Sequence, residues 1–258
     1  YGIVSRFGCM PLGNNLDHMG PLAVTPRDAA LVMDAIAGYD SRDDSSIATP
    51  AGDFWQDNFS LRGVRAGVPE NFFTERIAPE VAGAFRAALD RAKSNGAELK
   101  PIRVPDPEAL NAIGRVILMA EVSALMEPYA HRRDEFGPDV IALIDQGRLL
   151  PATDYINAQR LRRRWQREWA KVWKDIDILL TPTAPIVAPK IGQATVSLDG
   201  QEEDARLATT RLVRSINVLG LPAVSVPLPV SGLPIGLQII GPPFADNLVL
   251  STGGCLAK

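Results

Sequence analysis

The side chains that could act as nucleophiles, bases or metal ligands are few. Histidine occurs only at His18 and His131, and cysteine only at Cys9 and Cys255. The two histidines lie in unrelated segments, so their spacing does not favour a histidine-based catalytic pair or a multi-histidine metal site. Two distant cysteines are too few for a disulfide framework or a structural zinc site, and this usage is typical of a reducing, cytoplasmic compartment. The sequence therefore predicts no metal and no organic cofactor, and for Cys9 a packing role in the core.

No serine in the chain has an identifiable base. A serine hydroxyl is a weak nucleophile unless a neighbouring group takes its proton. The lysines fall at helix surfaces, loops or chain ends, where they should stay protonated: Lys93, Lys100, Lys171, Lys174, Lys190 and Lys258. We therefore expect no catalytic residue within residues 1–258.

Arginines gather in one stretch of a predicted helix. Such a run suits a surface for nucleic acid or another anion, but it is also typical of a solvated helix face. The whole chain has 27 basic and 30 acidic residues, a net charge of −3, so it has no general field that would attract nucleic acid. We expect a solvated face and no nucleic-acid partner. The run comprises Arg160, Arg162, Arg163, Arg164 and Arg167.

The elements that must position these side chains mix helices with short strands. Apolar residues at helical spacing, with capping and breaking residues at the ends, predict helices over 25–37, 79–94, 108–129, 139–146, 152–174 and 201–219. Short apolar runs bounded by Gly and Pro predict strands over 64–68, 98–104, 176–180, 222–227 and 235–240. We expect an α/β fold, with a strand-helix-strand unit over 64–104 and no internal domain linker.

The chain carries no signal for membrane insertion. It has no uninterrupted apolar run of about 18 residues, and its first residues, Tyr1-Gly-Ile-Val-Ser-Arg-Phe-Gly8, do not form a signal peptide. The first residue is Tyr rather than Met. We therefore expect no membrane partner and a piece of a longer chain.

Several segments, in this order, resemble the amidase signature family, which includes amidases and the A subunit of glutamyl-tRNA amidotransferase. The matching segments are Tyr1–Gly8, Asn15-Leu-Asp-His-Met-Gly-Pro21, Asp177-Ile-Leu-Leu-Thr-Pro-Thr-Ala-Pro185, Arg214–Pro227 and Gly232-Leu-Pro-Ile-Gly-Leu-Gln-Ile-Ile-Gly241. The likeness covers nearly the whole chain. It implies the amidase signature fold, a mixed β-sheet core covered by helices, incomplete at the N-terminal side. Residues 1–258 would then be the C-terminal portion of a single domain.

The resemblance also implies a chemistry. Family members hydrolyse C–N amide bonds with a nucleophilic Ser, a bridging Ser on a cis peptide and a Lys, and all three precede the position of Tyr1. This chain would then supply the wall of the substrate pocket and complete the sheet, for a small-molecule amide substrate. The alternative is a non-catalytic binding or assembly subunit related to amidotransferase A subunits. A homo-oligomer or a small partner subunit fits either interpretation.

Two residues become candidates for substrate binding through the resemblance. His18 lies in a loop that is near the active site in the family; otherwise it is a hydrogen-bonded loop residue. Arg162 ends an Ala-Gln-x-x-Arg match to the amidotransferase A subunit, where that arginine grips the substrate carboxylate with its planar fork. Thr210 stands where that subunit has an acid for the substrate amine, so glutaminase specificity is not implied. Ser251-Thr-Gly-Gly-Cys255 resembles the family's nucleophile loop but lies at the wrong end of the chain, and we expect Cys255 to be inert.

Overall fold

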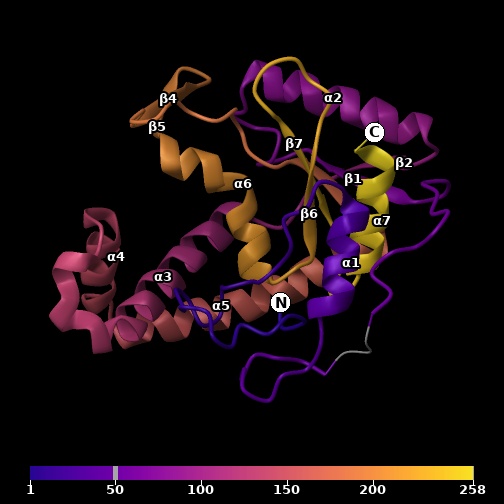
Figure 1. Ribbon diagram of the computed structural model, residues 1–258. Helices are drawn as coiled ribbons and strands as arrows, with labels where there is room; N and C mark the ends of the chain where they lie inside the picture. The colour runs from indigo at the N-terminus through magenta and orange to yellow at the C-terminus, as the bar shows by residue number, and fades with distance from the viewer. Residues whose placement is uncertain (49–51, 258) are drawn as a thin grey trace.

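A computed structural model describes residues 1–48 and 52–257. Its centre is a five-stranded mixed sheet with the strand order β2-β1-β3-β7-β6 (Figure 1). A separate hairpin pairs β4 with β5. The strands are β1 (Arg65–Pro69), β2 (Glu98–Ile102), β3 (Ile178–Pro182), β4 (Thr195–Leu198), β5 (Gln201–Asp204), β6 (Ala223–Pro227) and β7 (Gly236–Ile240).

Helices make up most of the remaining regular structure in the described residues. They are α1 (Pro26–Ile36), α2 (Pro79–Ser94), α3 (Pro107–Leu125), α4 (Pro138–Arg148), α5 (Ala152–Ala170), α6 (Ala205–Leu219) and α7 (Asp246–Leu256). Two 3-10 segments, η1 (Glu127–Glu135) and η2 (Val172–Lys174), follow α3 and α5. In the part of the chain that the structure describes, no single helix is both long and apolar enough to cross a bilayer; α3 and η1 meet that test only jointly, and they are bent by 89°.

The sheet confirms the predicted α/β class. β1 pairs with β2 in parallel across the predicted strand-helix-strand unit, and β3 adds a second parallel partner to β1. β7 is antiparallel to β3 and to β6, so the predicted strands over 222–227 and 235–240 pair as a hairpin. β6 therefore forms one edge of the sheet, with β7 as its neighbour.

Two apolar cores lie on the two faces of this sheet. Successive β3 residues alternate between them: Ile178 and Leu180 belong to the core under α2 and α7, and Leu179 belongs to the core under α3, α5 and α6. All five β3 residues are buried, as expected for a central strand covered on both faces. The second core also receives Trp169 from α5, whose ring nitrogen donates a hydrogen bond of 2.7 Å to the Pro105 carbonyl.

Three predicted elements are corrected. The helix expected from residue 201 begins at Ala205, because Asp199 and Gly200 adopt positive φ values of 50° and 76° and turn the chain into the β4–β5 hairpin. The Asp204 carboxylate then caps α6 by accepting a 2.9 Å hydrogen bond from Leu207 N. The segment 108–129 is helical only to Leu125 before η1, and 152–174 divides into α5 and η2. Outside these three elements, residues 1–8 form no strand and only a bridge between Val4 and Ala37.

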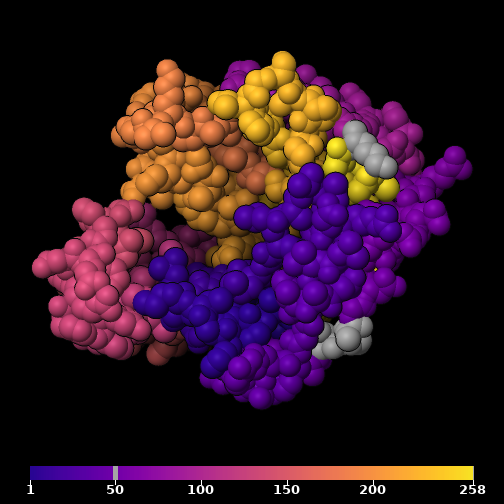
Figure 2. Space-filling model, viewed as in Figure 1, coloured from indigo at the N-terminus to yellow at the C-terminus, as the bar shows by residue number. Residues whose placement is uncertain are grey.

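The N-terminal segment spreads across the front of the molecule. Figure 2 shows it, in indigo and violet, reaching from the region of α4 to that of α7. Its apolar contacts form a small core of their own, in which Ile3 and Ala30 meet Leu250 of α7. Because residues 1–48 add no strand to the sheet, side-chain contacts must hold them in place.

Helices α3 and α4 approach each other closely at Gly147. A Cβ atom built on Gly147 would lie 1.9 Å from the Met119 carbonyl oxygen, whereas one on Gly83 of α2 would meet nothing within 4 Å. Gly147→Ala should therefore force the two helices apart and lower the free energy of unfolding by about 1–3 kcal/mol. Gly83→Ala should raise it by about 0.5–1 kcal/mol through helix propensity alone. Urea unfolding of both variants measures the difference; equal effects would contradict this account of the α3–α4 contact.

Candidate functional site

A cleft of about 410 Å³ opens between the N-terminal segment and the sheet. Its walls combine the first residues of the chain, the loop around His18, α1, α6, the β6–β7 end of the sheet and α7. Apolar side chains such as Ile3, Met33 and Val249 supply most of the lining, and a few polar groups stand among them. This composition is typical of a small-molecule site. The polar groups at the cleft are His18, Asn217, Gln238, Asp246, Asp17, Arg6 and Tyr1.

The loop that carries His18 is anchored on a buried carboxylate. Glu121 of α3 is only 7% exposed and accepts hydrogen bonds from the Asn15 backbone N at 2.9 Å, from the Asn15 side-chain amide and from the Tyr155 hydroxyl at 2.8 Å. Asp17 closes the loop on itself by accepting hydrogen bonds from Leu12 N at 2.8 Å and Gly13 N at 3.1 Å. The loop thus has a defined position although it is not part of the sheet.

The His18 ring has one favoured tautomer. Its Nδ1 lies 2.8 Å from the Leu16 carbonyl oxygen, which accepts and cannot donate, so Nδ1 carries the proton. The Asn217 amide also donates to that oxygen at 2.8 Å, and the two donors stand 3.1 Å apart because they share it. Nε2 therefore keeps its lone pair as an acceptor. An edge-on contact with the Tyr1 ring, 5.2 Å between centroids, fixes the ring plane.

The environment of His18 disfavours the imidazolium form. The residue as a whole is exposed, but the atoms packed around its ring displace water and so lower the pKa of His18 to about 4. The Leu16 carbonyl opposes this shift, while the α-amino group of Tyr1, Arg162 and Arg6 add to it because they are positive. His18 is thus a neutral hydrogen-bonding group at pH 7.

Arg162 lies behind the loop and is not among the residues that line the cleft. It is 8% exposed; Nε donates to the Val218 carbonyl at 2.6 Å and Nη2 donates to the Asn15 carbonyl at 3.0 Å. Burial lowers the pKa of Arg162, and the nearby Glu121 and Tyr155 oppose that effect. Arg162 thus joins α5 to the C-terminal end of α6 and to the His18 loop. The carboxylate contact predicted for it stays a prediction.

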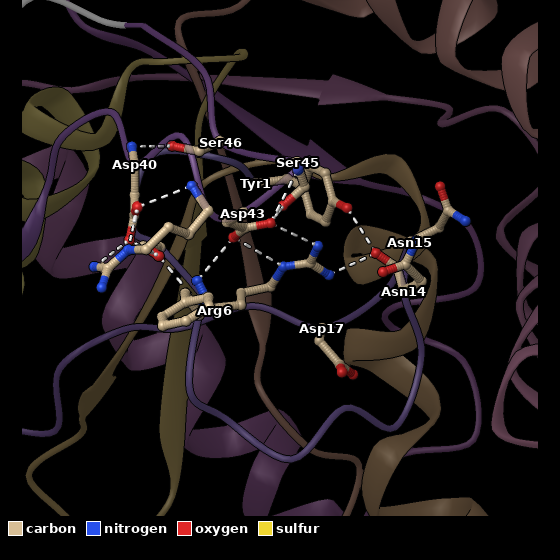
Figure 3. A network of polar contacts seen from close by, with 12 residues as sticks. Tyr1, Arg6, Asn14, Asn15, Asp17, Asp40, Asp43, Ser45 and Ser46 are labelled. Carbon is tan, nitrogen blue, oxygen red and sulfur yellow. Dashed lines mark hydrogen bonds and ion pairs between the residues drawn. The ribbon is translucent and has the colours of Figure 1, made fainter. Parts of the chain in front are cut away.

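A second polar network fixes the start of the chain (Figure 3). Arg6 forms an ion pair with the buried Asp43, 3.1 Å between Nη2 and Oδ1, and its Nη1 donates to the Asn14 carbonyl. The Tyr1 hydroxyl donates to the same carbonyl at 2.8 Å. The guanidinium of Arg6 and two bonds from Ser45 hold the pKa of Asp43 well below its usual range. The network therefore ties residues 1–6 to the loop at 40–46.

The other candidate residues lie outside the cleft. Cys9 is exposed, with its Sγ 3.8 Å from Met19 Sδ, so its predicted core role is wrong: the loop around it runs on the surface. Cys255 lies inside α7 and contacts the Phe59 carbonyl, so the Ser251–Cys255 match is helical. His131 is exposed in η1, and the described residues contain no cluster of potential metal ligands. Four arginines of the run are exposed on α5: Arg160, Arg163, Arg164 and Arg167.

Three contributors to the site were not identified from the sequence. Glu121 was detectable in principle, as the only charged residue between Val116 and Leu125 of α3, because such a residue in an apolar stretch commonly has a buried partner. Asn217 and Asp246 carried no such signal. Asn217 reaches Leu16 across 201 positions of sequence, and no local pattern encodes a contact at that distance.

Removing the Arg162 side chain should destabilise the protein. Arg162→Ala leaves the Val218 and Asn15 carbonyls without these donors and opens a cavity, so the free energy of unfolding should fall by about 2–4 kcal/mol. Arg163→Ala, one position along on the exposed face, should change it by no more than about 0.5 kcal/mol. Denaturant unfolding of the two variants tests this, and similar values would contradict the anchoring role.

The tautomer and environment of His18 predict a pH dependence. The pKa of His18 is lowered from 6.5 to about 4 in the folded protein, so between these values the unfolded chain binds a proton that the folded chain does not. The contribution of His18 to stability is therefore complete above about pH 6.5 and is lost as the pH falls toward 4. In His18→Gln this loss should be missing. The unfolding free energies of the two proteins are measured from pH 8 to 4 and subtracted, so that the pH dependence due to the carboxylates, which both proteins share, cancels. A difference that stays constant over this range would contradict the assignment.

Comparison with known proteins gives concordant matches. The family described as Amidase matches residues 1–250. An amidase from Pseudomonas putida is 37% identical over 229 residues, 88% of this chain and 49% of its own length. The A subunit of the glutamyl-tRNA(Gln) amidotransferase of Akkermansia muciniphila is 32% identical over 289 aligned positions, which cover 100% of this chain and 60% of the relative.

Solved structures agree in fold. One, described as a vestigial protein complex that reveals the evolutionary origins of an s-triazine catabolic enzyme, has a TM-score of 0.90 and 30% identity over 99% of this chain and 56% of its own. The A subunit of the glutamyl-tRNA(Gln) amidotransferase of Thermotoga maritima has a TM-score of 0.80 and 29% identity over 97% and 54%. The chain spans about half the length of these relatives. It belongs to the amidase signature family and matches the C-terminal part of its members.

Proposed function

We propose that this chain is part of a cytoplasmic amidase that hydrolyses C–N amide bonds of small molecules with a Ser–cisSer–Lys triad, and that the triad lies in polypeptide upstream of Tyr1. Residues 1–258 supply one wall of the substrate cleft and part of the sheet. Membership of the family and the apolar cleft with a few polar groups support this proposal.

The match of residues 1–250 to the amidase family carries the proposal, and the hydrogen bonds of the serines are compatible with a nucleophile elsewhere in the parent protein. The serine hydroxyls that form hydrogen bonds among the described residues bond to carboxylates, carbonyls, backbone N–H groups or threonine, and none bonds to a lysine or histidine. Ser215 Oγ is buried without a hydrogen-bond partner among the described residues. The lysine ammonium groups of residues 1–48 and 52–257 show one side-chain bond, from Lys171 to Glu168. Lys258 lies outside the described residues. A nucleophile without a base leaves amide hydrolysis to groups beyond this chain.

Sheet completion is supported by the free edge of β6. This strand is hydrogen-bonded to β7 on one side, and Ala223, Ser225 and Pro227 are exposed. An open strand edge invites pairing with another strand. A strand from the upstream part of the parent protein is the proposed partner, since the matched relatives are about twice as long as this chain.

Within this proposal the two substrate-binding candidates act differently. His18 borders the substrate directly, because it lines the cleft and presents a free ring nitrogen. Arg162 contributes to substrate binding through the loop that carries His18, because its Nη2 holds the Asn15 carbonyl. The second candidate function is a binding or assembly subunit, favoured by the relatives named as part of an amidotransferase and as a member of a protein complex. The upstream sequence separates the two: a Gly-Gly-Ser stretch with an earlier Ser-Ser and Lys means an enzyme.

Residues 1–258 alone should not hydrolyse any amide. The purified chain is assayed with aliphatic, aromatic and ureido amides and is treated with a serine-directed fluorophosphonate, beside the parent protein. We expect no turnover and no stoichiometric labelling of the chain, and one labelled serine in the parent, upstream of Tyr1. Turnover by the chain, or labelling of one of its own serines, would place the nucleophile within residues 1–258. An unlabelled, inactive parent would favour the assembly subunit.

A further inference from the structure

The hydrogen-bond donors on the side chains that line the cleft are already engaged within the protein. The Arg6 guanidinium binds Asp43 and the Asn14 carbonyl, and the Tyr1 hydroxyl binds the same carbonyl. The Asn217 amide and His18 Nδ1 both donate to the Leu16 carbonyl. Among the described lining residues, these side chains therefore have few free N–H or O–H donors with which to bind an anion.

Gln238 completes this pattern at the sheet. It is 4% exposed, and its amide nitrogen donates to the Thr181 hydroxyl at 2.9 Å and to the Leu212 carbonyl at 3.5 Å. Its amide nitrogen is thereby committed to the protein interior. The amide oxygens of Gln238 and Asn217 make no hydrogen bond to the described residues, and His18 keeps the Nε2 lone pair. The side-chain groups at the cleft that are still free to form hydrogen bonds are therefore acceptors.

Asp246 adds a negative charge to these acceptors. It lines the cleft in the first turn of α7, and its Oδ2 is enclosed without a hydrogen-bond partner among the described residues. The helix dipole favours a carboxylate in the first helical turn, which explains the position of Asp246. The dipole does not give Oδ2 a hydrogen-bond donor. Burial raises the pKa of Asp246, and the positive α-amino group of Tyr1 opposes that shift. In any longer chain that nitrogen is an uncharged peptide N–H.

We propose that this cleft selects ligands that are rich in N–H donors or positively charged, such as amino, amidino or ureido groups, and rejects carboxylates. Asp246 supplies the charge that recognises a cation, and His18 Nε2 supplies a neutral acceptor. The proposal rests on the proposed function in taking this cleft as the substrate site, and it narrows the substrate to amides that carry such a group. This preference runs against the carboxylate contact that the resemblance implies for Arg162. The Arg162 guanidinium lies behind the loop, outside the lining, and donates to backbone carbonyls there.

Three probes with the same ring test the selection: benzamidine, benzamide and benzoate. Their dissociation constants for residues 1–258 are measured by calorimetry or by NMR titration at pH 7. We expect benzamidine to bind about tenfold more tightly than benzoate, with benzamide between them. Acetylation of the Tyr1 α-amino group, which removes the competing charge, should tighten benzamidine binding further. Benzoate binding as tightly as benzamidine would overturn the proposal.

Variants separate the charged acceptor from the neutral one. Asp246→Asn should weaken benzamidine about tenfold and change benzamide less than about twofold. Asp90→Asn, an exposed carboxylate on α2, is the matched control and should change neither. His18→Leu, which leaves α7 intact, should weaken both benzamidine and benzamide about threefold and leave benzoate unchanged. Unchanged benzamidine binding in both Asp246→Asn and His18→Leu would sink the proposal.

These measurements involve binding alone, so their outcome is separate from that of the proposed function. A parent that fails to hydrolyse amides would remove the amidase proposal and leave the donor selectivity of the cleft standing. A parent that hydrolyses amides while its cleft prefers benzoate would keep the amidase proposal and remove the selectivity.

Discussion

The position of the N-terminal segment depends on buried polar contacts, because that segment contributes no strand to the central sheet. Glu121 from α3 and Arg162 from α5 are both almost fully buried. Glu121 accepts a hydrogen bond from the backbone N of Asn15, and Arg162 donates one to the Asn15 carbonyl. Asn217 from α6 donates a further hydrogen bond to the Leu16 carbonyl. Three helices that cover one face of the sheet thus converge on a few consecutive residues. The cleft exists because this attachment places the loop opposite the sheet and α7.

Burying charged groups in this way is costly unless every donor and acceptor finds a partner. Glu121 meets that requirement with three hydrogen bonds, and Arg162 meets it partly with backbone carbonyls rather than with an acid. The charged Arg162 donor binds the Val218 carbonyl near the end of α6. This carbonyl is one of the last in the helix and has no hydrogen-bond partner within it. The loop, the end of α6 and the α3–α5 contact therefore stabilise one another, and a change at one of them is transmitted to His18.

The first residues of the chain and the start of the last helix, α7, meet at the same cleft. Tyr1 and Asp246 both line it, and α1 packs against α7 beside them. The edge strand β6 contributes Ala223 and Val224 to the same wall. A cleft bordered by an open strand edge and by acceptor groups suits a site that further polypeptide completes. The relatives, which are about twice as long, are consistent with that arrangement.

Much of the fold follows from local sequence, and the exceptions have physical causes. Apolar periodicity and capping residues located α1, α2 and the sheet strands, because the Thr25 cap and the two-residue period of β3 act over a few residues. The start of α6 was misplaced because the β4–β5 hairpin competes with helix formation for residues 201–204. Cys9 was misplaced because burial depends on what the rest of the chain covers. The resemblance to a family indicated His18 and Arg162 as candidates for substrate binding, but it did not indicate their hydrogen-bond partners.

Chemical identity was readable from residue types, whereas geometry required the folded chain. From the sequence alone we expected no histidine-based or cysteine-based metal site and no serine with a base, since those expectations need only an inventory of side chains and their spacing. Only the tertiary structure decided that Arg162 faces backbone carbonyls, that His18 Nε2 is the free nitrogen and that Asp246 stands in the cleft. The contacts of Arg162 span more than 50 positions, and the place of Asp246 depends on the packing of separate elements. The His18–Leu16 contact is local, but the loop that holds it is positioned by Glu121 and Asn217 from distant helices.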